Sequence, residues 1–93
     1  MKAILVTYSI SHQPTSVQNQ LRKQINGHND RSHGGKYMYR REGILDKITH
    51  VKPSRSTIII PLKESEKVLK VLKKYEAKIK TYSIEISESE FRK

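Results

Sequence analysis

The chain has 93 residues, a length that accommodates one domain. It carries 19 lysines and arginines against nine aspartates and glutamates, so its formal net charge is +10 and its field attracts polyanions. The absence of cysteine excludes disulfides, thiolate zinc sites and cysteine nucleophiles, and is compatible with the cytoplasmic location that we expect. No apolar run approaches the roughly 20 residues of a membrane-spanning helix, and the N-terminal run that ends at Val6 is too short for a signal-peptide core.

The apolar content is low for a domain of this size. Hydrophobic residues make up 34% of the chain and aromatic residues 6%, and a small domain buries only about 60–65% of its unfolded surface. Because this leaves a lean core, the composition predicts that a homodimer could bury additional apolar surface.

A strand and a helix are predicted first. Residues 3–8 form a nearly unbroken apolar run, which favours a strand buried on both faces. A helix is expected to begin near Thr15, whose side chain can cap it, with Gln18 completing a capping box. Its apolar stripe is Val17, Leu21 and Ile25. Gly27 predicts the end of this helix.

The middle of the chain carries weaker patterns. Residues 27–36 are polar and contain three of the four glycines, so they predict a flexible loop. Residues 37–39 are a candidate strand. Residues 43–51 fit either one helical turn or an edge strand, and residues 52–54 predict a turn because they contain proline.

The last third has the clearest periodicity. Residues 57–60 form a second fully apolar run that Pro61 ends, which predicts a second central strand. Residues 63–78 predict a helix. Its apolar face is Val68, Leu69, Val71, Leu72 and Tyr75. Residues 79–86 alternate between apolar and polar side chains, as in a strand with one solvated face.

This order of elements predicts an α+β fold of the ferredoxin-like βαββαβ type. Two helices would cover one face of an antiparallel sheet, and the other face would stay open for a ligand or a second subunit. We expect a single domain over residues 1–87, followed by a frayed polar tail over residues 88–93. A winged helix is the alternative fold, and only residues 43–51 could supply the third helix that it needs.

The opening apolar strand, the helix after a short loop and the Ile58-Ile59-Ile60-Pro61 strand end broadly resemble the small ferredoxin-like CRISPR-associated nucleases. Those proteins carry an aspartate at the end of the first strand. Residues 7–10 of this chain read Thr-Tyr-Ser-Ile and contain no acid. The resemblance therefore covers the architecture and does not extend to the acidic residue of the nuclease motif.

A basic and aromatic segment carries the functional prediction. In a strand, Tyr37 and Tyr39 share one face and two arginines follow them. Stacking on tyrosine together with arginine is typical of proteins that hold single-stranded nucleic acid, RNA or DNA. The predicted nucleic-acid-binding residues are Arg31, Lys36, Tyr37, Tyr39, Arg40, Arg41, Lys52 and Arg55.

Two other function classes stay open. His28, Asp30 and His33 could hold a transition metal in a small metal-dependent nuclease or phosphodiesterase. Alternatively, the charge could serve an acidic protein partner of a regulatory module. The segment 27–36 lacks the Gly-x-x-x-x-Gly-Lys-Ser/Thr pattern of nucleotide hydrolases. The prediction accordingly assigns no catalytic residue, no metal site and no cofactor.

Overall fold

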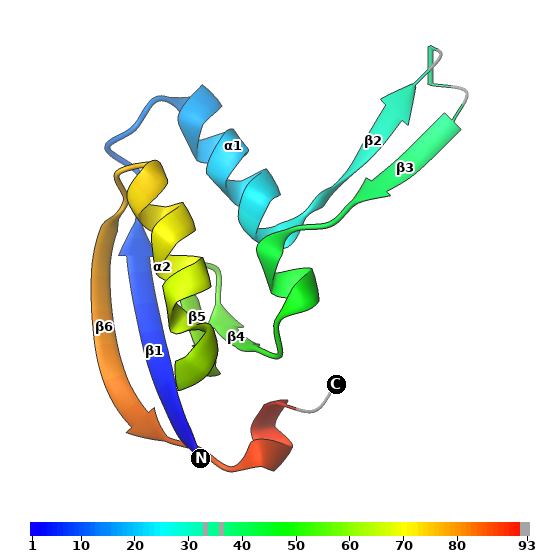
Figure 1. The fold of residues 1–93 in the computed structure, drawn as a ribbon. Helices are drawn as coiled ribbons and strands as arrows, with labels where there is room; N and C mark the ends of the chain where they lie inside the picture. The colour runs from blue at the N-terminus through cyan, green and yellow to red at the C-terminus, as the bar shows by residue number, and fades with distance from the viewer. Residues whose placement is uncertain (33, 36, 92–93) are drawn as a thin grey trace.

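The structure, a computed structural model, describes residues 1–32, 34–35 and 37–91. It is an α+β protein in which two helices lie on one face of a four-stranded antiparallel sheet, and a separate two-stranded hairpin projects away from this body (Figure 1). The sheet has the strand order β4-β5-β1-β6 and the hairpin consists of β2 and β3. In the part of the chain described, no helix is long and apolar enough to cross a membrane.

The elements follow one another along the chain with short connections. The first half contains β1 (Lys2–Ser9), α1 (Thr15–Asn26), β2 (His28–Ser32), β3 (Tyr37–Arg41) and the 3-10 helix η1 (Ile44–Lys47). The second half contains β4 (Val51–Ser54), β5 (Thr57–Pro61), η2 (Leu62–Glu64), α2 (Ser65–Lys74), β6 (Lys78–Glu85) and η3 (Glu88–Phe91).

The two apolar runs form the two central strands, as the sequence predicted. β1 pairs antiparallel with β5, with Val6 opposite Ile58, and with β6 on its other side. Val6, Ile58 and Ile60 are completely buried under the helices. Continuous apolar sequence is needed here because a central strand has both faces at least half covered.

The helices close the core with residues one turn apart. Leu21 and Ile25 of α1 and Val68 and Leu72 of α2 are buried against the central strands, as the spacing of each stripe predicted. The predicted capping role of Thr15 is wrong: Pro14 occupies the N-cap position and no side chain caps the helix.

The prediction of a loop over residues 27–36 is wrong for the first half of this segment. Residues 28–32 are strand β2, which pairs with β3 in a two-stranded sheet separate from the main sheet. The candidate strand at residues 37–39 is present as β3, but it belongs to the hairpin. The fourth strand of the main sheet is β4, where the proline at residue 53 had indicated a turn. Proline is tolerated there because β4 is an edge strand with an irregular register.

The remaining corrections concern the C-terminal third. Helix α2 ends at Lys74, earlier than predicted, and Glu76 turns the chain with a positive φ of 57°. In β6 the residue opposite Leu5 is Tyr82, so Tyr82 lies on the helix-free face, where 53% of it is exposed. Phe91, in the tail that was expected to fray, is buried at 6% exposure, so the tail is packed against the body at this residue.

Candidate nucleic-acid interface

The β2–β3 hairpin, which we call the arm, presents an exposed aromatic strand. Tyr37, Met38 and Tyr39 are 49%, 58% and 48% exposed, and every residue of β3 is exposed. Among the described residues of the arm, none belongs to the core cluster. Large apolar side chains on a projecting hairpin are unusual for a monomer surface and indicate a contact site.

The register of the arm sorts its side chains onto two faces. Tyr39 lies opposite Asp30 and Arg41 lies opposite His28, so Tyr37, Tyr39 and Arg41 share one face. Met38 lies opposite Arg31 on the other face. Each face of the arm therefore combines an arginine with at least one large apolar side chain, which is the composition expected for stacking on bases beside phosphates.

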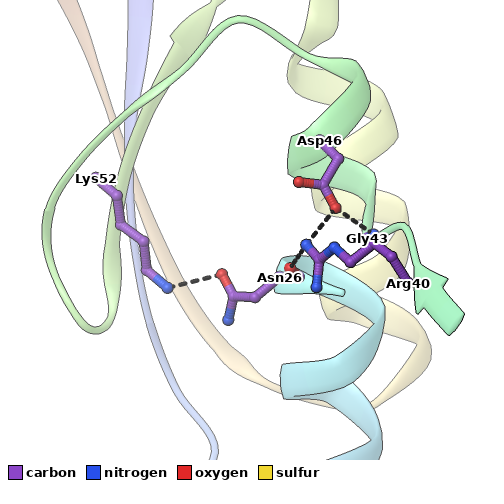
Figure 2. Close-up of polar contacts among 5 residues, drawn as sticks. All are labelled: Asn26, Arg40, Gly43, Asp46 and Lys52. Atoms are coloured by element: carbon purple, nitrogen blue, oxygen red, sulfur yellow. Dashed lines mark hydrogen bonds and ion pairs between the residues drawn. The ribbon is translucent and has the colours of Figure 1, made fainter. Parts of the chain in front are cut away.

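Arg40 makes its contacts at the root of the arm, which is the point where β2 and β3 join the body. Its Nη2 atom donates to the main-chain oxygen of Asn26 at 2.9 Å and to Oδ2 of Asp46 at 2.8 Å (Figure 2). The same carboxylate oxygen accepts the backbone N–H of Gly43 at 2.8 Å. Arg40 thus ties β3 to the end of α1 and to η1, and its predicted contact with phosphate stays a prediction.

Two glycines bring the strands of the arm together where they leave the body. Gly27 has a positive φ of 74°, and a Cβ atom added to it would overlap the backbone of Arg41 and of Gly43. A Cβ on Gly43 would overlap the backbone of Gly27 and of Ile25. Since backbone touches backbone here, a side chain at either position would force the two strands apart, and glycine is the residue that fits.

Arg41 and Arg31 are held more loosely than Arg40. The Nε atom of Arg41 is 3.5 Å from the carboxylate of Asp30, and both side chains are at least half exposed. A pair with this exposure contributes little to stability. Arg31 is exposed as well. Both guanidinium groups can therefore reach an external anion.

The other two described residues of the predicted site, Lys52 and Arg55, meet at a cavity of about 220 Å³. We call this cavity the cationic pocket. Its lining includes three cations from separate elements: Arg22 of α1, Lys52 of β4 and Arg55 of the β4–β5 turn. Arg22 was missed by the sequence prediction. The signal was its position directly after buried Leu21, which puts it at the border of the apolar stripe of α1.

The charges in the cationic pocket act on one another. Burial, and then the neighbouring charges of Arg55 and Arg22, lower the pKa of Lys52 below its ordinary 10.5. Lys52 Nζ donates to Oδ1 of Asn26 at 2.8 Å, a neutral partner (Figure 2). Burial raises the pKa of Tyr8, and Arg22 partly offsets this rise. The ammonium group of Lys52 is therefore partly removed from solvent, and its hydrogen-bond partner is the neutral amide of Asn26.

Asn26 joins the two parts of the interface. Its main-chain oxygen accepts from Arg40 at the root of the arm, whereas its side chain accepts from Lys52 in the cationic pocket. The pocket therefore borders the root of the arm.

Two of the residues named in the predictions, His33 and Lys36, lie outside the described residues. Within the described ranges, no group of three or more His, Cys, Asp and Glu side chains could hold a metal ion. His28 and Asp30 are two residues apart in β2 and so lie on the same face of the strand. The Nδ1 atom of His28 is buried without a hydrogen-bond partner.

The chain was also compared with known proteins. It matches no protein-family model, no curated protein and no solved structure at a significant level.

Proposed function

We propose that the protein binds nucleic acid, RNA or DNA, with the arm as its main contact surface. The observation that carries this proposal is the exposed Tyr37-Met38-Tyr39 strand, flanked by Arg31 and Arg41 on a hairpin that stands clear of the body. A base stacked on an aromatic side chain contributes about 1–3 kcal/mol, largely without regard to sequence.

Arginine and lysine side chains supply the phosphate contacts in this proposal. Arg31 and Arg41 lie on the arm, and Arg22, Lys52 and Arg55 line the cationic pocket at its root. Lys36, predicted from the sequence, would add a sixth cation. The net charge of +10 draws the polyanion in before these contacts form.

We also infer that the four-stranded body is ferredoxin-like, with the arm inserted after its first helix. The strand order β4-β5-β1-β6 supports this, because the first and third strands of a βαββαβ unit are its central strands. Both helices cover one face, as that arrangement requires. The insertion explains why the chain contains two strands more than the unit needs.

A homodimer is a further part of the proposal. The helix-free face carries a row of side chains across four strands, because Val51 lies opposite Ile59, Ile59 opposite Leu5 and Leu5 opposite Tyr82. This row would be covered in a dimer of sheets. Sedimentation velocity at several protein concentrations tests it.

The salt dependence of binding tests the proposed function. Fluorescence anisotropy would be measured with labelled single- and double-stranded DNA and RNA at several salt concentrations. If six phosphates are neutralised, the logarithm of the affinity falls against the logarithm of the salt concentration with a slope of about −4 to −5. Absence of binding to all four probes near physiological salt would contradict the proposal and favour a protein partner.

A further inference from the structure

The cationic pocket is a recess whose lining contains both charged and apolar side chains. Its lining combines the three cations Arg22, Lys52 and Arg55 with the largely apolar side chains of Tyr8, Ile10 and Leu21. Leu21 is buried at 1% exposure, whereas Arg22 and Arg55 are exposed. The apolar residue therefore lies at the bottom of the recess and the two arginines lie at its mouth.

No carboxylate lines this recess or neutralises its cations within the described chain. Arg22 Nη1 donates to the side-chain oxygen of Asn19 at 3.4 Å, and Lys52 donates to that of Asn26. Arg55 contributes its main-chain oxygen to a 3.5 Å contact with the Tyr8 hydroxyl. None of the ion pairs in the described chain includes these three cations. Three like charges thus line one cavity, and the side-chain partners of Arg22 and Lys52 there are neutral amides.

A bound dianion would remove the repulsion that this arrangement imposes. Lys52 is the most affected cation, since burial and its two arginine neighbours oppose its charge. An anion within reach of all three cations would attract each of them and so offset their mutual repulsion. Its charge-assisted hydrogen bonds would also replace the hydration that the cations lose in the pocket. Guanidinium groups at the mouth suit this role because their planar donors match phosphate oxygens in pairs.

The recess favours the end of a chain over its middle. An internal phosphodiester carries one charge and continues on both sides, whereas a terminal phosphomonoester enters a recess end-on and carries about −1.5 to −2 charges at pH 7. The apolar wall formed by Tyr8, Ile10 and Leu21 offers a surface for the organic group next to the phosphate. Inorganic phosphate alone would leave this wall unused.

From this geometry we propose that the cationic pocket binds a terminal phosphomonoester of a nucleotide, presented by a free mononucleotide or by the 5′ end of a strand. The nucleotide part of this assignment rests on the proposed function, because the arm beside the pocket is the surface that would hold the strand. The phosphomonoester part rests on the pocket alone.

The test compares ligands that differ by one phosphate. Adenosine and adenosine 5′-monophosphate would be titrated calorimetrically, and one oligonucleotide would be tested by anisotropy with a 5′-phosphate and with a 5′-hydroxyl, its label at the 3′ end. We expect the phosphorylated ligand of each pair to bind at least about tenfold more tightly, as a single charge-assisted hydrogen bond would produce.

Three variants locate the effect. Arg55→Gln lies in an exposed turn, and Lys52→Met removes the innermost charge; each should abolish most of the preference for the phosphorylated ligand. Lys70→Gln, at an exposed position of α2, removes the same formal charge away from the pocket and should preserve the preference. Circular dichroism and thermal unfolding verify that each variant is folded.

The outcomes separate the pocket from the proposed function. Binding of the monophosphate without binding of either oligonucleotide supports the pocket and contradicts the proposed function. Equal binding of the phosphorylated and the unphosphorylated oligonucleotide overturns the pocket and leaves standing the proposed function, whose main contact surface is the arm. A preference that Lys70→Gln weakens as much as Arg55→Gln does reflects net charge and also overturns the pocket.

Discussion

Arg40 and Arg41 are neighbours in the sequence and have different structural roles. Arg40 donates to a main-chain oxygen and to the Asp46 carboxylate, and 48% of its side chain is exposed. Arg41 makes one 3.5 Å contact with Asp30, and 62% of its side chain is exposed. A double substitution of both arginines would therefore mix a loss of anchoring with a loss of ligand contact.

The single substitutions should separate these roles. Arg40→Ala removes an ion pair worth up to about 1 kcal/mol and a hydrogen bond worth about 1 kcal/mol, so the free energy of unfolding should fall by about 1–2 kcal/mol. Arg41→Ala should change it by less than about 0.5 kcal/mol and weaken nucleic-acid binding directly. Urea denaturation and anisotropy measure the two effects. Equal destabilisation by both substitutions would refute the anchoring role of Arg40.

Lys52 makes the stability depend on pH in a defined direction. Its pKa is lowered in the folded state from 10.5, so between the folded-state pKa and 10.5 the unfolded chain binds more protons. Stability therefore rises with pH in this window, and the unfavourable contribution of the charged lysine is fully present below it. Burial raises the pKa of Tyr8, so above pH 10.0 the folded state keeps the phenol proton that the unfolded chain loses. This group therefore lowers the stability of the fold as the pH rises above 10.0.

A comparison with Lys52→Met isolates the lysine, because Tyr8 is present in both proteins. The free energy of unfolding of the wild type, relative to Lys52→Met, should increase as the pH rises from neutral toward 10.5. Urea denaturation at several pH values measures this difference. A difference that stays constant or moves in favour of the variant would mean that the fold does not penalise the charge of Lys52.

At the scale of elements, the arm is an addition to a body that is complete without it. All nine residues of the buried core cluster lie outside the arm. Gly27 and Gly43 bring the two strands into backbone contact at the root. An isolated two-stranded hairpin is at best marginally stable, so the arm depends on this root and on the Arg40–Asp46 pair for its position.

Excision of the arm should leave a folded protein. Replacing residues 28–42 with a two-residue Gly-Ser linker between the adjacent glycines removes no core side chain, so we expect a cooperative unfolding transition. The loss of stability should be about 1–2 kcal/mol, the value of the Arg40 contacts. Thermal unfolding followed by circular dichroism measures it. A variant without a cooperative transition would show that the arm is part of the folding unit.

The sequence predicted the central strands and both helices because those elements are defined by their own apolar patterns. It missed β2, whose sequence His-Asn-Asp-Arg-Ser contains no β-branched or large apolar residue. This strand forms because β3 pairs with it along its whole length. It also missed β4, since Pro53 indicates a turn wherever the edge position of a strand is unknown.

At the scale of the whole molecule, the interface depends on contacts between distant segments. Lys52 and Arg55 were predicted as phosphate contacts, but the sequence could not indicate that they meet Arg22, because that meeting is set by how α1 lies against the β4–β5 turn. The segment around Tyr37 and Tyr39 was predictable from composition. Its place in a separate hairpin was not, because the partner strand β2 has a polar sequence without a strand pattern of its own.

The central claim is that the arm holds nucleic acid through its tyrosines. Tyr37→Ala/Tyr39→Ala would be compared with Tyr82→Ala by anisotropy, using whichever of the four probes the wild type binds most tightly. Tyr82 is a matched control, because it is 53% exposed and lies on the helix-free face of the main sheet.

Loss of two stacked bases, at about 1–3 kcal/mol each, predicts that the double variant binds at least about thirtyfold more weakly. The Tyr82→Ala variant should bind as the wild type does. Wild-type affinity of the double variant, with its fold intact by circular dichroism, would contradict the account.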